Sequence, residues 1–149
     1  MKEIQEAMER LAALCREEAP RYCIEPEGAY AHFIAACPLL LKGRKERFVA
    51  LYLDGRRQVI RHEVVSVGTL TATLVHPREV FAPALECRAA SLVVAHNHPS
   101  GDPTPSHEDR LLTERLSQAG RLLGINLDDH LVIAKTGFVS LRRLGILVG

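Results

Sequence analysis

A short apolar run in the second half of the chain ends directly on two histidines, and this arrangement limits what the chain can fold into. Residues 91–95, Ser-Leu-Val-Val-Ala, are typical of a buried β-strand. Residues 96–106 follow as a loop that three prolines and one glycine make stiff. A helix is expected over residues 106–119, with Gly120 in the left-handed position that ends it. The chain must therefore place a core strand, a rigid loop and a helix in direct succession.

The spacing of His96 and His98 is suitable for binding a metal. Side chains two residues apart point to the same side of an extended strand end, so both imidazoles can reach one ion. Asp102 and Asp109 are the nearest carboxylates, and either would complete a site with three protein ligands and one open position for water, as in catalytic zinc sites. Ser106 and Asp109 also have the spacing of a capping box at a helix start, and spacing alone does not choose between a cap and a ligand.

The rest of the sequence alternates between helical and strand patterns. We expect helices over residues 2–18 and 26–37, strands over 48–53, 58–65 and 131–134, and a helix that starts at Pro77 and bends at Pro83. The first two helices should pack together, because the first has an apolar stripe that needs a partner. Residues 48–53 are apolar throughout, which is typical of a strand buried on both faces, and Asp54-Gly55 predicts a hairpin turn after it.

Size, charge and cysteine content exclude several classes of protein. The chain has 149 residues, enough for one core but too few for two ordinary domains. Lys and Arg number 19 against 18 Asp and Glu, so the charge does not support binding to nucleic acid, and the basic residues within 42–47 are interpreted as a solvated turn. No apolar run approaches the ~18 residues that span a bilayer, so no membrane association is expected. Four scattered cysteines without a Cys-x-x-Cys pair are typical of reduced thiols in a cytoplasmic protein.

Two other families with a similar histidine pattern can be excluded. An amidohydrolase-type barrel needs about 250 residues, and a nucleobase deaminase needs His-x-Glu together with Pro-Cys-x-x-Cys, which this sequence lacks. Among the remaining histidines, His62 and His107 are expected to face solvent. His130, beside Asp128 and Asp129, is interpreted as a packing or supporting residue rather than a ligand.

The segment His96-x-His98-Pro99, with Ser106-x-x-Asp109 after it, resembles the JAMM metalloprotease motif of JAB/MPN domains. Residues 67–70, 75–79, 96–102 and 127–130 resemble the RadC branch of these domains, and the likeness covers roughly residues 38–145. We therefore divide the chain into an N-terminal helical segment, 1–37, that packs on the core, and a RadC-like JAB/MPN domain, 38–149. The resemblance implies an α/β fold of the cytidine-deaminase-like kind, with a central mixed β-sheet flanked by helices.

The resemblance also implies roles for individual residues. It implies that His96, His98 and Asp109 bind Zn²⁺ and that Ser106 stabilises an oxyanion. The general base of the family is a glutamate at the start of the first core strand, and Glu46 has that position here. Glu46 is therefore preferred to three other glutamates, which are Glu63, Glu79 and Glu86.

Two features of this sequence differ from those of relatives that share the motif. The residues before the first core strand do not resemble the helix-hairpin-helix segment of RadC proteins, which weakens a role on DNA, and Asn97 stands where deubiquitinating relatives have Ser or Thr. We expect a zinc-dependent hydrolase that cleaves a peptide or isopeptide bond in an unidentified protein or peptide substrate. The alternative is a RadC-type DNA-repair-associated or protein-binding module with little or no hydrolase activity. The sequence leaves a homodimer open.

Overall fold

A mixed β-sheet of five strands runs through the centre of the protein in the computed structural model, which describes residues 1–17, 25–68 and 75–147. The strand order is β2-β1-β3-β4-β5. The strands are β1 (Arg47–Leu53), β2 (Val59–Val67), β3 (Ser91–Asn97), β4 (Asn126–Ala134) and β5 (Gly137–Ser140). β3 and β4 are parallel, and the other neighbouring pairs are antiparallel. The helices are α1 (Lys2–Glu17), α2 (Pro26–Ala36), α3 (Leu39–Lys42), α4 (Pro77–Glu86) and α5 (His107–Leu123).

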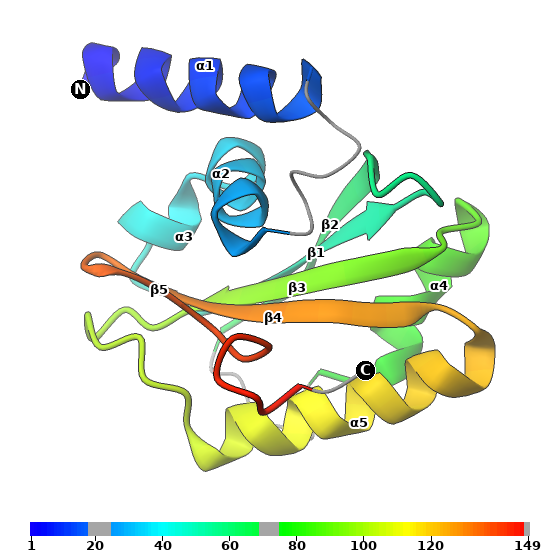
Figure 1. Ribbon diagram of the computed structural model, residues 1–149. Coiled ribbons are helices and arrows are strands. Elements are labelled where there is room, and N and C mark those ends of the chain that lie inside the picture. The colour runs from blue at the N-terminus through cyan, green and yellow to red at the C-terminus, as the bar shows by residue number, and fades with distance from the viewer. Residues whose placement is uncertain (18–24, 69–74, 148–149) are drawn as a thin grey trace.

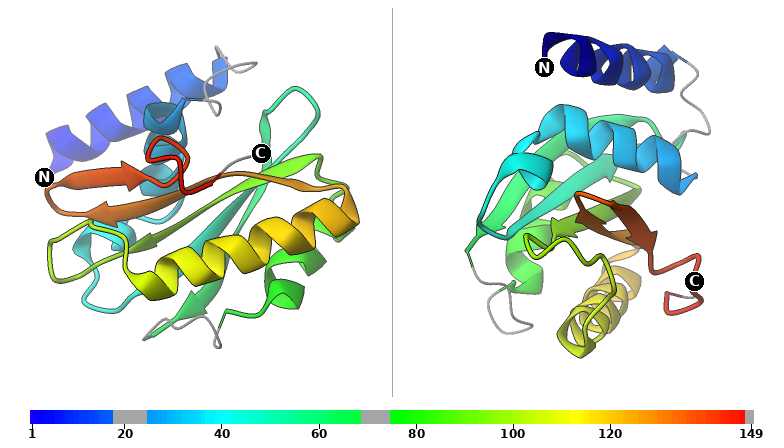
Figure 2. Two further views of the ribbon diagram at one scale, coloured as in Figure 1. Left: turned by 60° about the horizontal axis from the view of Figure 1, so that its bottom comes forward. Right: turned by 90° about the vertical axis from the view of Figure 1, so that its left-hand side faces the viewer.

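Helices cover both faces of this sheet (Figures 1 and 2). α2 and α3 lie on one face with α1 packed against α2, and α4 and α5 lie on the other. β1 shows how the sequence creates two cores, because its alternate side chains enter opposite layers. Phe48, Ala50 and Tyr52 belong to the core under α4 and α5, whereas Val49, Leu51 and Leu53 belong to the core under α2. The expected α/β fold with a central mixed sheet and flanking helices is confirmed.

Most of the expected elements are present. β1 is buried on both faces and turns through residues 54–58 into β2, α2 begins at Pro26, and α4 contains Pro83. α1 packs against α2 as expected, although residue 18, the expected end of the first helix, lies outside the described residues, as do residues 69 and 70 of the RadC-like segment 67–70. The short helix α3 has no counterpart among the expected elements.

The expected end of α5 is wrong. α5 continues past Ala119 to Leu123, and Gly124, with φ of 72°, is the left-handed residue that caps it. Gly120 lies inside the helix, where a Cβ atom would collide with the backbone carbonyl of Ile125. Glycine is therefore required at position 120 by a close approach of two backbone segments rather than by a helix end.

The expected last strand, 131–134, is wrong in two respects: it begins earlier than expected, and it is not the last strand. β4 begins at Asn126, five residues earlier than expected, and β5 follows it across the turn at Thr136. The missed residues include Asp128, Asp129 and His130, whose polarity hides the strand pattern although all three are buried. The carboxylate of Asp129 accepts hydrogen bonds from Ser140 Oγ (2.6 Å) and from the backbone N–H of His130 (2.7 Å).

The surface and the cysteines bear on further expectations from the sequence. Among the described helices, none combines the length and the apolar character that a membrane span needs. Cys37 and Cys87 are free thiols, while Cys23 lies outside the described residues. Of the basic residues within 42–47, three are exposed as expected, which are Lys42, Arg44 and Lys45, whereas Arg47 is half-buried at the start of β1. His62 and His107 are exposed as expected.

Candidate metal centre

The end of β3 places His96 and His98 on the same side of the sheet. β3 lies between β1 and β4, and the N–H of His98 donates to the carbonyl of Ile133 (2.8 Å), so the extended backbone continues through the second histidine. The Nε2 atoms of His96 and His98 are 3.0 Å apart. His96 is buried and His98 is half-buried. The two imidazoles therefore converge as their spacing predicts.

Asp109 completes this cluster from the first turn of α5. Its Oδ1 lies 3.0 Å from His96 Nε2 and its Oδ2 lies 3.2 Å from His98 Nε2. The capping box is present as well, since Ser106 Oγ accepts from the Asp109 N–H (3.1 Å) and Asp109 Oδ2 accepts from the Ser106 N–H (2.8 Å). The cap and the cluster are thus one arrangement, in which the cap holds the carboxylate toward the histidines.

Asp102, the other carboxylate near the histidines in sequence, does not join the cluster. Its Oδ1 accepts from Thr104 N (3.0 Å) and from Thr104 Oγ1 (2.7 Å), within the exposed loop. Its backbone carbonyl instead lies 2.9 Å from His98 Nδ1. A carbonyl can only accept, so His98 Nδ1 carries a hydrogen, and in the neutral ring Nε2 keeps its lone pair.

Burial and close contacts shift the pKa values of Asp109, His98 and His130. Burial alone would raise the pKa of the Asp109 carboxyl, but its contacts with His96 and His98 outweigh burial and hold this pKa well below its usual range. The bond to Asp109 raises the pKa of His98, against the opposing effect of partial burial. Complete burial lowers the pKa of His130, so this ring is neutral near pH 7. Asp109 is therefore a carboxylate, and His98 holds a proton more readily than a free histidine does.

The donor atoms fit a divalent metal ion. One atom from each of His96, His98 and Asp109 can be chosen so that all three lie within 4.8 Å of one another. Two imidazole nitrogens and one carboxylate oxygen are ligand types that Zn²⁺ accepts in sites that keep a fourth position open. Converging lone pairs and a negative charge repel each other unless a proton or a cation lies between them, and this favours occupation by a cation.

Glu46 lines the same hollow as the cluster. This hollow of about 260 Å³ is bounded by Glu46, His96, His98, Pro99, Ser100, Ser106 and Asp109. The rival glutamates Glu63, Glu79 and Glu86 line a different hollow, between β2 and α4. The structure therefore places Glu46 and Ser106 beside the cluster of His96, His98 and Asp109. It places the three alternative glutamates in a different hollow.

Asn97 is a site residue that the sequence argument missed. It points away from the hollow between the two histidines, and its side-chain amide holds the segment that carries Glu46. Asn97 Oδ1 accepts from Arg47 N (2.7 Å), and Asn97 Nδ2 donates to Lys45 O (3.1 Å). The two bonds join residues about fifty positions apart in sequence, so spacing gave no signal for them.

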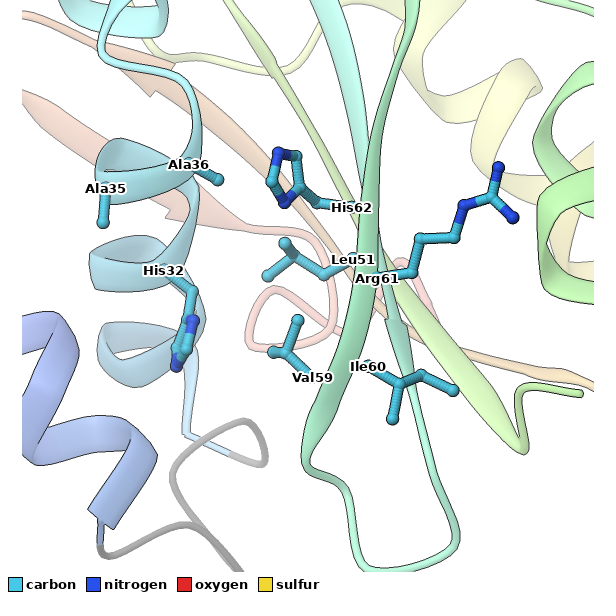
Figure 3. A pocket seen from close by; sticks show the side chains of 8 residues that line it. All are labelled: His32, Ala35, Ala36, Leu51, Val59, Ile60, Arg61 and His62. Carbon is cyan, nitrogen blue, oxygen red and sulfur yellow. The ribbon is translucent and has the colours of Figure 1, made fainter. Parts of the chain in front are cut away.

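A larger groove of about 380 Å³ lies elsewhere, between α2 and the edge strand β2 (Figure 3). It is lined by His32, Ala35, Ala36, Leu51, Val59, Ile60, Arg61 and His62. No carboxylate is among these residues, and the groove holds none of the three cluster residues. We therefore place the functional site in the smaller hollow.

The mixed sheet, the His-x-His strand end and the aspartate on the following helix together define a JAB/MPN-type domain. The sequence profile of the RadC-like JAB domain matches residues 25–146. The chain belongs to the RadC-like JAB domain family.

Curated relatives agree with this assignment. The chain is 46% identical to a UPF0758 protein of Methanosarcina acetivorans over 129 residues, which are 87% of this chain and 55% of the relative. It is 56% identical to a UPF0758 protein of Symbiobacterium thermophilum over 104 residues, which are 70% of this chain and 44% of the relative. The chain thus spans about half the length of the curated relatives it matches, and their names assign no activity.

Proposed function

We propose that this protein is a zinc-dependent hydrolase of the JAMM type that cleaves a peptide or isopeptide bond. The observation that carries the proposal is the convergence of His96, His98 and Asp109 in a hollow that Glu46 also lines. Membership in a domain family that includes metallohydrolases supports it. A carboxylate next to three metal ligands is the arrangement needed to activate water.

In the proposed reaction Glu46 moves the proton. Zinc, when bound by His96, His98 and Asp109, would lower the pKa of a coordinated water from 15.7 toward about 7. Glu46 would accept a proton from the attacking water as the water oxygen bonds to the substrate carbonyl carbon, and would return this proton to the leaving amine as the C–N bond breaks. The hollow is partly open to solvent, which would give a substrate segment access to these groups.

Ser106 is proposed to stabilise the oxyanion. In the capping box Ser106 Oγ acts as an acceptor, toward the N–H of Asp109. This bond leaves the hydroxyl hydrogen for donation to the oxygen of the attacked carbonyl. The same serine can therefore hold the ligand-bearing helix and contact the reacting group.

The test is hydrolysis by the zinc-loaded 149-residue chain in water enriched in ¹⁸O. A mixture of peptides and isopeptide-linked lysine peptides is incubated with the protein, and products are identified by mass spectrometry. We expect new carboxyl groups that carry ¹⁸O. Glu46→Gln should abolish this cleavage while keeping zinc, whereas Glu79→Gln, a matched change at an exposed glutamate in the other hollow, should not.

Two results would contradict the proposal. Zinc-loaded wild-type protein that cleaves no substrate in the mixture would favour the binding module with little or no hydrolase activity. Cleavage that persists in Glu46→Gln would exclude Glu46 as the base.

A further inference from the structure

We infer that His130 and Thr113 form a relay that fixes the ring tautomer of His96 and so presents its Nε2 lone pair to the metal. The inference deepens the proposed metal site and rests on it, but it does not depend on hydrolysis. Both relay residues lie outside the ligand set and outside the hollow. They act through His96 and are positioning residues.

The relay is a continuous line of short hydrogen bonds from α5 through β4 to β3. Thr113 Oγ1 donates to the backbone carbonyl of Asp109 (2.7 Å). Thr113 Oγ1 also lies 2.6 Å from His130 Nδ1, and His130 Nε2 lies 2.8 Å from His96 Nδ1. Thr113, His130 and His96 are each at most 1% exposed, so water does not compete for these bonds.

Packing keeps the two imidazole rings in place. Phe48 stacks on His96 with ring centroids 6.3 Å apart, and its ring meets His130 edge-on at 5.7 Å. Phe48 itself is fully buried in β1. A ring flip would replace the hydrogen-bonded nitrogens by carbons in this buried site, so the hydrogen bonds and the packing together fix the partner of each nitrogen.

Counting hydrogens along the relay decides the tautomers. The Thr113 hydroxyl has one hydrogen, and it is directed to the Asp109 carbonyl, which can only accept. Thr113 Oγ1 must then accept from His130 Nδ1–H. His130 is completely buried, and its ring nitrogens lie beside two uncharged groups, Thr113 Oγ1 and His96 Nδ1. A second ring hydrogen would bury a charge without a counter-ion in contact, so His130 keeps one hydrogen and its Nε2 accepts from His96 Nδ1–H. His96 is left with a bare Nε2 that faces Asp109 and His98.

His98 is held in the same Nδ1–H tautomer by a different contact, because its Nδ1 hydrogen is directed to the carbonyl of Asp102. In their neutral forms both ligand rings are thus held with Nε2 free for a metal before any metal arrives. A ligand histidine that donates its other N–H to a fixed acceptor binds metal more tightly, and loss of the acceptor typically costs about 10–100-fold in affinity. The relay starts from the backbone of Asp109, so it also couples this ligand to His96.

The first test reads the tautomers in the metal-free 149-residue chain. Long-range ¹H–¹⁵N correlation spectra at about pH 8 distinguish the two neutral ring forms of each histidine. We expect Nδ1–H forms for both His96 and His130. An Nε2–H form of His96 would overturn the inference, whether or not the protein binds zinc.

The second test measures zinc affinity by competition with a chelator in two pairs of variants. Thr113→Val removes the hydroxyl at constant shape and should weaken binding about 10-fold, whereas Thr113→Ser should retain the wild-type affinity. His130→Leu should weaken binding about 10–100-fold, whereas His130→Gln, whose amide oxygen can accept from His96, should recover most of the loss. Circular dichroism of each variant checks that it is folded.

Equal affinities in Thr113→Val and Thr113→Ser would contradict the relay, because a purely structural role would not depend on the hydroxyl. If wild-type protein binds no zinc, the proposed function fails, and the spectra of the metal-free chain still decide the relay. The two failures are therefore distinguishable.

Discussion

Arg47 donates its backbone N–H to the side-chain oxygen of Asn97 over 2.7 Å, and this bond ties the start of β1 to the residue between the two histidines. The amide nitrogen of Asn97 donates to Lys45 on the other side of Glu46. Glu46 is consequently held between two anchored peptide groups. A residue that does not line the hollow thus anchors the peptide groups on both sides of the proposed base.

Replacing Asn97 should separate metal binding from catalysis. In Asn97→Ala the segment around Glu46 loses both anchors, and a displacement of about 1 Å in a catalytic group can cost about 10²-fold in kcat. Zinc content should be unchanged, because none of the three ligands is altered. Peptide cleavage rates and zinc analysis of the same samples check this prediction.

Asn126→Ala is the matched control for this change. Asn126 is also a strand asparagine with a hydrogen-bonded side chain, which donates to Asp128 at a site away from the hollow. We expect a kcat near that of the wild type. An Asn97→Ala variant with wild-type kcat would contradict the role given to Asn97.

Ser106 should affect stability and turnover separately. Ser106→Ala removes the cap and should lower the free energy of unfolding by about 1 kcal/mol, whereas Ser106→Gly should cost only a few tenths. Both variants lack the hydroxyl, so both should lose about 10²–10³ in turnover while keeping zinc. Thermal unfolding and rate measurements on the two variants check this. If turnover fell in Ser106→Ala but not in Ser106→Gly, the loss would come from lower stability and not from the missing hydroxyl. That result would exclude Ser106 from oxyanion binding.

Zinc binding should release protons in a pH-dependent way. The contact with Asp109 raises the pKa of His98 above the ordinary 6.5, so below the raised pKa His98 carries a proton that zinc must displace from Nε2. Apparent zinc affinity should therefore fall as the pH drops through the raised pKa and level off above it. Competition with a chelator of known proton affinity, between about pH 5 and pH 8, measures this dependence. An apparent zinc affinity that does not fall between about pH 7 and pH 5 would show that His98 does not hold this proton.

Replacing Gly120 by alanine tests how closely α5 packs against the backbone of Ile125. Helix propensity alone predicts that Gly120→Ala stabilises the protein by about 1 kcal/mol. The collision of the new Cβ with the carbonyl of Ile125 predicts the opposite, a loss of about 1–3 kcal/mol in the free energy of unfolding. Chemical denaturation measures the sign directly. A more stable Gly120→Ala variant would contradict the close approach seen here.

The sequence was most informative where local patterns coincide with the tertiary structure. The apolar run of β3 and the spacing of His96 and His98 predicted both the strand and the shared direction of the rings. β4 was found only in part, since Asp129 and His130 look unlike strand residues until their partners Ser140 and Thr113 are known. Buried polar groups need partners, and these two partners lie 11 and 17 positions away, on other elements of the fold.

The sequence likewise predicted only part of the candidate site. The capping spacing of Ser106 and Asp109 left two interpretations, and the structure satisfies the cap while placing the carboxylate beside the histidines. Glu46 came from the family resemblance alone, because a glutamate before a strand carries no signal by itself. The contacts of Asn97 with Arg47 and Lys45, and the contact of His130 with His96, join residues 34 or more positions apart, which a single sequence cannot reveal.

Zinc content tests the central claim most directly. Protein purified without chelator and analysed by mass spectrometry of its metals should contain about one zinc per chain. The His96→Ala/His98→Ala variant should contain almost none, whereas His62→Ala/His107→Ala, which removes two exposed histidines, should match the wild type. Equal zinc in the wild type and the His96→Ala/His98→Ala variant would contradict the metal centre described here.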